Sequence, residues 1–243
     1  MHRQINIAFD FRSDTPTGKD PDVHSPTLRR YHKHLWSKSL PGGAAFQLND
    51  TTPRAYLHHR SEIGEYFLSS DCVIPSFRKE TRLSHIFARL QPGDLDAFVS
   101  NSYTIGGMMV FPGNCINGKM TINGARGFHP RIKDRFDLTV ECIRRHYSND
   151  SSPLGDTLAR YADFFRLFGD FRGYIEFFLL QDLVTDDYSA VRFFMPFEDF
   201  NKSPLPNSIE AYIAYKGLAM SFIEARNQRI LESGQSRGLG QEL

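Results

Sequence analysis

An arginine-rich stretch at residues 121–135 contains the residues best suited to chemistry. Its sequence reads TINGARGFHPRIKDR, so glycines flank the Ala-Arg126 pair and positive charge gathers at Arg126, Arg131 and Arg135. Close backbone approach at glycine, together with the N–H groups that begin the next helix, suits an anion such as phosphate. We therefore predict a phosphate or nucleotide site here. We expect Arg126→Ala to abolish that activity while the thermal midpoint of unfolding stays nearly unchanged.

The same stretch also has a purely structural interpretation. The loop would turn at its glycines, and an arginine would pair with Asp134 or Asp137. The chain contains no G-x-x-x-x-G-K-[ST] string and no G-x-G-x-x-G pattern after a strand. The sequence therefore predicts neither a Walker A loop nor a Rossmann dinucleotide site.

A predicted helix at about 26–38 offers a second basic surface. The face opposite its apolar positions carries Arg29, Arg30 and Lys33. Guanidinium groups clamp phosphates through paired hydrogen bonds, and neighbouring aromatic rings can stack on a base. Contact with phosphate or nucleic acid is one interpretation of this face, and a solvated basic surface is the other.

An acidic loop near the N-terminus suggests metal chemistry. Asp10 stands near the end of a predicted strand, and Asp14, Asp20 and Asp22 follow it. Mg²⁺ prefers such oxygen ligands, so Asp10 and Asp14 would be the catalytic pair of a phosphoryl-transfer enzyme or a nuclease. The alternative is a solvated loop in which the aspartates stabilise turns.

A third arrangement joins the basic helix to a pair of serines. His32 lies beside Arg29 and Arg30, and Ser69 and Ser70 end an aromatic-rich strand. This set resembles the enzymes of ADP-ribosyl transfer, which implies NAD as substrate, with the arginine and His32 holding the dinucleotide. The sequence departs from that pattern because His32 is predicted on a helix and no clear E-x-E or Q-x-E follows.

The elements that must position these residues are predicted from hydrophobic periodicity. Alternating apolar residues predict strands, and apolar residues three or four positions apart predict amphipathic helices. The predicted strands lie at 4–11, within 44–77 and at about 98–111; the predicted helices lie at 26–38, 79–90, about 134–147, 153–168, 171–184 and 208–231.

This order of elements predicts an α+β fold. The part at 1–115 is mainly β with one or two helices, and the part at 116–232 is mainly helical. No long linker separates the two parts, so we predict a single domain over 1–232 and a flexible tail at 233–243.

Composition limits the classes of function. Lys and Arg number 29 and Asp and Glu number 28, so any basic site must be local. The three cysteines are widely spaced, which is typical of reduced thiols and excludes a disulfide framework. The N-terminus has no apolar signal region and no segment is long and apolar enough to span a membrane. We therefore expect a cytoplasmic protein without a membrane partner.

Several long strings resemble a family of functionally uncharacterised proteins encoded by bacteria and phages. The resemblance covers residues 5 to about 230, and it implies a prokaryotic or phage origin without an assigned activity. Proteins of this kind often belong to toxin, phage-defence or counter-defence systems. The strings are FDFRSDTPTGKDPDVHSPTLRRYHKHLWSKSLP, TINGARG, IKDRFDLTVECIRRHY and DFFRLFGDFRGYIEFFLLQDLV.

Two classes of function follow from these observations. The first is an enzyme that acts on nucleotides or nucleic acid, with NAD or Mg²⁺ as the implied cofactor. The second is a non-catalytic module that binds a nucleotide, a nucleic acid or a protein partner. A carboxylate such as Asp10, Asp14 or Glu65 in one cleft with Arg126 and Arg29 would favour the enzyme. A cleft of arginines, lysines and aromatic residues alone would favour the binding module.

Overall fold

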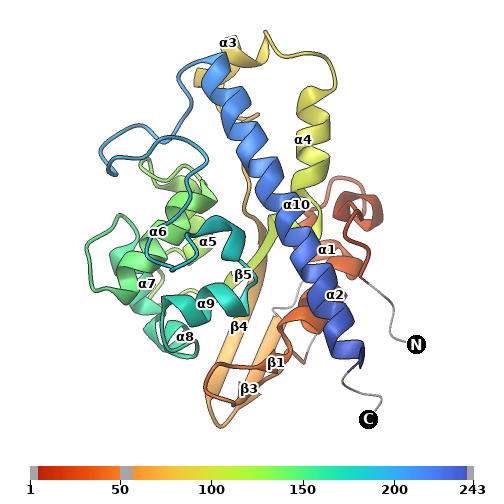
Figure 1. Cartoon of the computed structure of the whole chain (residues 1–243), viewed down its shortest axis with the longest axis vertical. Helices are drawn as coiled ribbons and strands as arrows, with labels where there is room; N and C mark the ends of the chain where they lie inside the picture. The colour runs from red at the N-terminus through yellow and green to blue at the C-terminus, as the bar shows by residue number, and fades with distance from the viewer. Residues whose placement is uncertain (1–4, 50–56, 240–243) are drawn as a thin grey trace.

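A three-stranded antiparallel sheet lies behind the long C-terminal helix (Figure 1). The computed structural model describes residues 5–49 and 57–239. The sheet has the order β3-β4-β5, formed by β3 (Leu57–Ser61), β4 (Gly64–Cys72) and β5 (Met108–Pro112). β5 is buried along its whole length, whereas β4 ends in the polar run Ser69-Ser70-Asp71-Cys72. The middle strand therefore ends in half-buried polar side chains.

The N-terminal segment precedes this sheet and is mainly helical. It contains η1 (Phe11–Asp14), α1 (Pro21–His24) and α2 (Pro26–Trp36), followed by a two-stranded sheet of β1 (Lys38–Ser39) and β2 (Ala45–Phe46). The predicted strand at 4–11 is wrong for residues 5–11, which form turns and the start of η1. Phe11 is buried and packs edge-on against Tyr31, so its alternating apolar neighbours serve packing against α2.

The predicted start of helix α2 is confirmed. Ser25 is the N-cap, and its hydroxyl accepts a hydrogen bond from the Leu28 amide at 3.1 Å. Pro26 occupies the first helical position, where a missing N–H costs nothing. The helix buries Leu35 and Trp36 on its inner face.

The chain between β4 and β5 is helical, which agrees in part with the helix predicted at 79–90 but differs from the β segment predicted at about 98–111. It forms η2 (Thr81–Leu83), α3 (Ser84–Phe87), α4 (Asp94–Ser102) and η3 (Ile105–Gly107), so only the end of the predicted segment at 98–111 is a strand. Gly93 precedes α4 with a φ of 87°, and Asp94 and Asp96 occupy its first turn. Acidic residues there interact favourably with the helix dipole, which explains the helical outcome.

The C-terminal half is helical, as predicted, with different boundaries. A short helix lies within the stretch 121–135 that was predicted as a loop, and the predicted helix at 171–184 is interrupted at Leu179, which has a φ of 55°. The last helix continues past residue 231 into the predicted tail. The elements are α5 (Ile122–Phe128), α6 (Phe136–Tyr147), α7 (Gly155–Arg160), α8 (Ala162–Arg166), α9 (Phe171–Phe177), η4 (Gln181–Leu183) and α10 (Ile209–Leu239).

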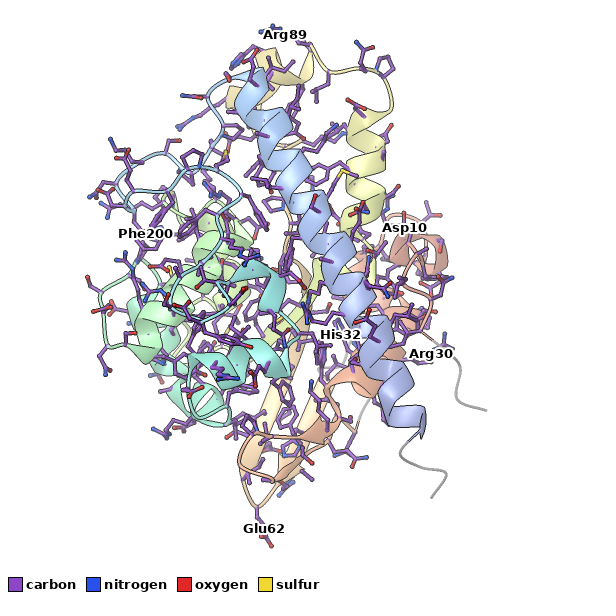
Figure 2. All side chains as sticks on the ribbon, viewed as in Figure 1. Asp10, Arg30, His32, Glu62, Arg89 and Phe200 are labelled. Carbon is purple, nitrogen blue, oxygen red and sulfur yellow. The ribbon has the colours of Figure 1, made fainter. Side chains whose placement is uncertain are left out.

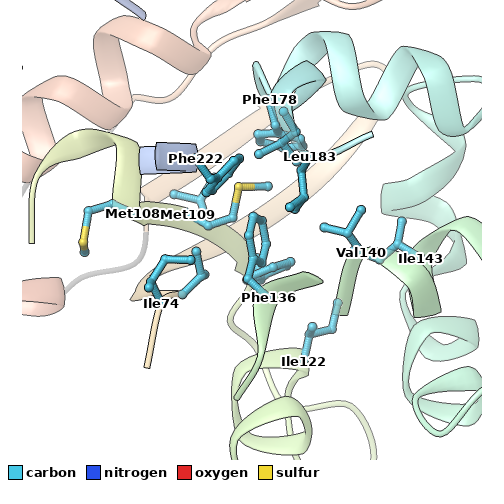
Figure 3. Packing of buried hydrophobic residues seen from close by; sticks show 14 of the residues in the cluster. Ile74, Met108, Met109, Ile122, Phe136, Val140, Ile143, Phe178, Leu183 and Phe222 are labelled. Atoms are coloured by element: carbon cyan, nitrogen blue, oxygen red, sulfur yellow. The ribbon is translucent and has the colours of Figure 1, made fainter. Parts of the chain in front are cut away.

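One hydrophobic core joins the sheet to the helices (Figure 3). Met109 of β5, Phe136 of α6 and Phe222 of α10 are all buried in it. Helix α10 packs against α3, α4, η3 and η4 as it crosses the molecule (Figure 1). The predicted α+β fold is therefore confirmed, and the phenylalanine-rich second half supplies much of its core.

A polar contact fixes α10 against the turn before β5. Asn227 is buried, its side-chain oxygen accepts a hydrogen bond from the Gly106 amide at 2.7 Å, and its nitrogen donates to the Thr104 hydroxyl at 2.9 Å. We expect Asn227→Ala to lower the free energy of unfolding by about 2 kcal/mol, because it leaves a buried N–H without a partner. Urea denaturation measures this loss. Gln228→Ala, an exposed control on the same helix, should change stability by less than about 0.5 kcal/mol.

Candidate functional site

A groove of about 450 Å³ lies beside the polar end of β4. Three parts of the chain form its walls: the segment that follows β4, the end of α4, and the connection between α5 and α6. Its volume is in the range of small-molecule sites, about 300–1,000 Å³. The lining residues are Cys72, Ile74, Pro75, Ser76, Phe77, Arg78, Lys79, Glu80, Val99, Ser102, Tyr103, Gly127, Lys133 and Asp134.

Backbone strain is concentrated in the walls of this groove. Phe77, Lys133 and Asp134 have φ values of 57°, 48° and 67°, in the left-handed region that residues other than glycine rarely adopt. The conformation of Asp134 is held by a hydrogen bond from its amide to the Arg126 carbonyl at 3.0 Å. Such strain costs about 1–3 kcal/mol per residue and tends to cluster at functional sites. It supports the groove as the candidate site.

Two carboxylates meet on one nitrogen of Arg126 next to the groove. Arg126 on α5 places Nη1 2.6 Å from Asp71 Oδ2 at the end of β4 and 2.6 Å from Asp134 Oδ1 in the groove wall. The Asp71 and Asp134 side chains remain 23% and 35% exposed, whereas Arg126 is 0% exposed. Both carboxyl groups are therefore half-buried, and the guanidinium that joins them is fully enclosed.

Arg126 has an internal role in this arrangement. Its Nη2 donates to the Val73 and Asp134 carbonyls at 3.1 and 2.6 Å, and its Nε donates to Thr139 Oγ1 at 3.3 Å. With Nη1 on two carboxylates, the guanidinium has no N–H directed to solvent for an external phosphate. The geometry thus matches the structural interpretation of the stretch, in which an arginine pairs with Asp134, and replaces the predicted phosphate contact at Arg126.

Burial raises the pKa of both carboxyl groups, Asp71 and Asp134. Desolvation raises the pKa of Asp71 to about 7, against the opposing attraction of Arg126. Desolvation also raises the pKa of Asp134, and Arg126 again opposes the shift. Two interacting carboxyls beside one cation titrate as a pair. The pair therefore holds a proton near neutral pH, where isolated aspartates would have lost theirs.

This shift predicts a specific pH dependence of stability. Because the pKa of Asp71 is about 7 in the folded protein and 3.8 for an unperturbed aspartate, its stabilising contribution is complete below about pH 4 and is lost as pH rises to about 7. We expect Asp71→Asn to remove this loss. The thermal midpoint of the variant minus that of the wild type should increase between pH 5 and pH 7.5. A constant difference across that range would contradict the raised pKa.

Asp22 adds a third carboxyl group to this end of the site. Helix α1 places it against the edge of β4, where its Oδ2 accepts a hydrogen bond from the Cys72 amide at 3.3 Å. Its Oδ1 is buried and has no hydrogen-bond partner among the described residues. Burial and the neighbouring Asp71 raise the pKa of Asp22 well above its usual range. Asp22, Asp71 and Asp134 together are called the acidic centre below.

The groove is also lined by basic residues. Arg78 and Lys79 are exposed, and Lys133 forms an ion pair with Glu80 at 3.0 Å. Arg78 lies 3.5 Å from Asp96, and both side chains are largely in solvent, so this pair is weak. Lys79 has no ion-pair partner within the described ranges 5–49 and 57–239. Arg78, Lys79 and Lys133 are called the basic rim below, and they can bind an anionic group of a ligand.

His32 is buried beside Ser70, but its protonation state prevents it from activating the hydroxyl. The indole Nε1 of Trp36 only donates, so the His32 Nδ1 that it contacts at 3.0 Å is the acceptor. The proton of neutral His32 is then on Nε2, which donates to Ser70 Oγ at 2.8 Å. Burial, Arg226 and Arg29 lower the pKa of His32 to about 3. Both ring nitrogens of His32 have internal partners and the side chain is 0% exposed, so this geometry does not support the predicted role of His32 in holding a dinucleotide.

The other residues on and around α2 have local partners. Asp10 pairs with Arg12 at 2.6 Å, and Asp14 accepts hydrogen bonds from the Ser25 hydroxyl and the Thr27 amide at 2.5 and 3.0 Å. Asp10 and Asp14 thus stabilise η1 and the start of α2, as the structural interpretation of the acidic loop predicts. None of the described residues forms a group of three His, Cys, Asp or Glu that could hold a metal ion.

The predicted basic residues are dispersed. Figure 2 shows Arg30 on the outer side of α2 and His32 toward the interior. Arg29 is buried, Arg30 contacts Thr27 and Lys33 donates to the Asn49 carbonyl at 3.1 Å. The remaining predicted residues are equally separate: Ser69 contacts Asn123 on α5, Arg131 is exposed in the α5–α6 connection, and Arg135 is buried in an ion pair with Asp137.

The residues that the site brings together come from distant parts of the chain. From the sequence, Asp22 was predicted as part of the acidic loop and Asp134 as a possible structural partner of an arginine. Arg78, Lys79 and Tyr103 carried no sequence signal of function. Only the packing of α1 and α5 on β4 makes these residues neighbours.

The fold and the site define an α+β protein with a carboxylate–guanidinium centre beside a ligand-sized groove. Residues 5–230 match the model of DUF6994, described as a family of unknown function, and the chain belongs to that family. This confirms the predicted membership in a family without an assigned activity. No curated protein and no solved structure matches the chain. Among the described helices, none has the length and apolar character that crossing a membrane requires.

Proposed function

We propose that this protein is an enzyme that acts on a nucleotide or a similar phosphate-bearing small molecule in the groove. The observation that carries the proposal is the Asp71–Arg126–Asp134 arrangement, in which two half-buried carboxyl groups share one nitrogen at 2.6 Å and one of them, Asp134, lines the groove. A carboxyl pair that keeps a proton near neutral pH is suited to general acid–base catalysis, because it can both accept and return a proton at working pH.

The basic rim would bind the anionic part of the substrate. Arg78 and Lys79 are exposed at the groove, and a phosphate can displace the weak contact of Arg78 with Asp96. Tyr103 lines the same groove and offers an aromatic face to a base or sugar. A substrate with its phosphate on the rim would extend its other end toward Asp134.

Arg126 acts on the reaction through the carboxylates. It holds the Asp71 and Asp134 oxygens at one nitrogen. When either carboxyl loses its proton, the positive charge of Arg126 therefore stabilises the negative charge that is left. Asp134 is the group that lines the groove and is therefore the base or acid in direct reach of substrate. Asp71 modulates the proton affinity of Asp134 as its coupled neighbour.

Incubation with nucleotides tests the proposal. Purified protein is mixed with mono-, di-, tri- and cyclic nucleotides and with NAD, and products are identified by liquid chromatography and mass spectrometry. We expect one class to be converted, with loss of conversion in Arg78→Ala/Lys79→Ala. Asp163→Asn, which changes a 76% exposed carboxylate paired with Arg166, is the matched control and should retain activity.

Two outcomes would contradict the proposal that the protein is an enzyme. Binding without conversion, seen as a thermal shift that the rim variant abolishes, would make the protein a nucleotide-binding module. No binding and no conversion by any nucleotide would overturn the assignment of the groove.

A further inference from the structure

A glycine of α5 forms the groove wall beside Asp134. Asp134 is the carboxyl group of the acidic centre that lines the groove, and Gly127 lines it as well. A β-carbon at position 127 would lie 3.9 Å from Asp134 Oδ1, an ordinary van der Waals contact. Among the described residues, apart from its own helix and its chain neighbours, no other atom lies within 4 Å of that point. A larger side chain at 127 would therefore extend into the groove next to the carboxyl.

The fold does not require a glycine at position 127. Gly127 does not have a positive φ, so other residues can adopt its backbone conformation. Gly106 and Gly107 are different, because a β-carbon at either would collide with a backbone oxygen of another segment. Glycine inside a helix is less stable than alanine. Gly127 therefore lowers the stability of α5 and gives no gain in packing.

Asp134 is held in place and cannot move aside for a side chain at 127. Its amide donates to the Arg126 carbonyl at 3.0 Å, and its Oδ1 lies 2.6 Å from Arg126 Nη1. Arg126 directly precedes Gly127, so the helix and the carboxyl are fixed to each other through one residue. A side chain at 127 would therefore cover Asp134 rather than displace it.

We infer that Gly127 is a specificity-determining residue of the groove, because the absence of a side chain there leaves the space in which a substrate group reaches Asp134. This inference rests on the proposed function and identifies the residue that limits the size of the group presented to Asp134. Gly127 acts only through the space that it leaves open. A side chain at 127 excludes the reacting part of the substrate from Asp134 and leaves Arg78 and Lys79 free to bind the phosphate.

Carboxyl labelling tests access to Asp134 without any assumption about the substrate. A water-soluble carbodiimide couples accessible carboxyl groups to glycinamide, and peptide mass spectrometry gives the labelled fraction at each residue. Asp163, whose side chain is 76% exposed, is the internal reference. In Gly127→Leu, labelling of Asp134 relative to Asp163 should fall at least about fivefold, the loss that overpacking of one contact can cause. Gly127→Ala should give a smaller decrease.

Gly217→Leu is the matched control. Gly217 also lies inside a helix, α10, with open space at its β-carbon position, and it does not line the groove. Its labelling ratio should equal that of the wild type. Gly127→Ala and Gly217→Ala should each raise the thermal midpoint by about 1–4 °C, because alanine replaces glycine inside a helix. A lower midpoint in Gly127→Ala would show that the fold needs this glycine and would overturn the inference.

Conversion of nucleotides tests the consequence for the substrate. Gly127→Leu should convert the nucleotide that the wild type uses at least about tenfold more slowly, because the reacting group is misplaced. Calorimetric affinity should fall less than the rate, since the basic rim is unchanged. Unchanged labelling of Asp134, or unchanged conversion, in folded Gly127→Leu would overturn the inference.

The same measurements separate this inference from the proposed function. If the wild type neither binds nor converts any nucleotide, the proposed function fails. Reduced labelling of Asp134 in Gly127→Leu would then still assign the control of access to Gly127, and unchanged labelling would remove that role too. If Gly127→Leu does not fold, the labelling ratio of Gly127→Ala decides, with Gly217→Ala as its control.

Discussion

Asp134→Asn is expected to reduce conversion of the nucleotide substrate at least about 100-fold, within the range that general acid–base catalysis contributes. The amide cannot accept or return a proton, yet it keeps the size of the carboxyl and its place 2.6 Å from Arg126. Substrate binding at the basic rim should therefore persist. Initial rates and calorimetric binding, measured on the same preparation, separate the two effects.

The control for this variant is Asp163→Asn. It removes one negative charge from the surface, and Asp163 does not line the groove. It should leave the rate unchanged within a factor of about two. Retention of full activity by Asp134→Asn would show that Asp134 is not the proton-transfer group. Loss of binding together with rate would assign Asp134 to substrate binding.

Arg126→Met is expected to destabilise the protein by about 3–5 kcal/mol, because it leaves Asp71 and Asp134 without their counter-charge in a partly buried site. It also leaves the Val73 carbonyl without a donor from Arg126. Chemical denaturation at pH 7.5 measures the change. This outcome differs from the sequence-based expectation, in which Arg126→Ala spares the thermal midpoint.

Arg131→Ala is the matched control, since Arg131 lies in the same stretch and is exposed. Its effect on the free energy of unfolding should lie within about 0.5 kcal/mol of zero. If Arg126→Met unfolds at the same denaturant concentration as the wild type, the ion pairs around Arg126 contribute little. In that case Arg126 would not hold Asp71 and Asp134 together as a pair.

Local sequence patterns predicted those features that depend on neighbours in the chain. The Ser25-Pro26 pair predicted the start of α2, and apolar spacing predicted the helical second half. Periodicity failed at residues 5–11, which form turns and the start of η1, and at residues 98–107, which form the end of helix α4 and η3; only the end of the predicted segment at 98–111 is the strand β5. In both places tertiary packing outweighs a short alternating pattern. An apolar side chain can be buried from a turn or a helix as well as from a strand.

The candidate site depends on contacts that no local pattern contains. The stretch 121–135 was correctly singled out, but its sequence does not show whether Arg126 faces solvent or the interior. That depends on Asp71, which is separated from Arg126 by an intervening set of helices and one strand. Similarly, Asp10 and Asp22 look alike in the acidic loop, yet Asp10 pairs with Arg12 while Asp22 packs against β4.

Titration of the aspartate carboxyl groups by carbon-13 NMR tests the central claim most directly. In the wild type, the transition of the Asp71 carboxyl should lie near pH 7, and it should disappear in Asp71→Asn as the Asp134 resonance shifts to a new midpoint. That result would establish a proton held by the carboxyl pair beside the groove. If every aspartate carboxyl titrates below about pH 5, Asp71 and Asp134 are an ordinary ion-paired set and the account of the site is contradicted.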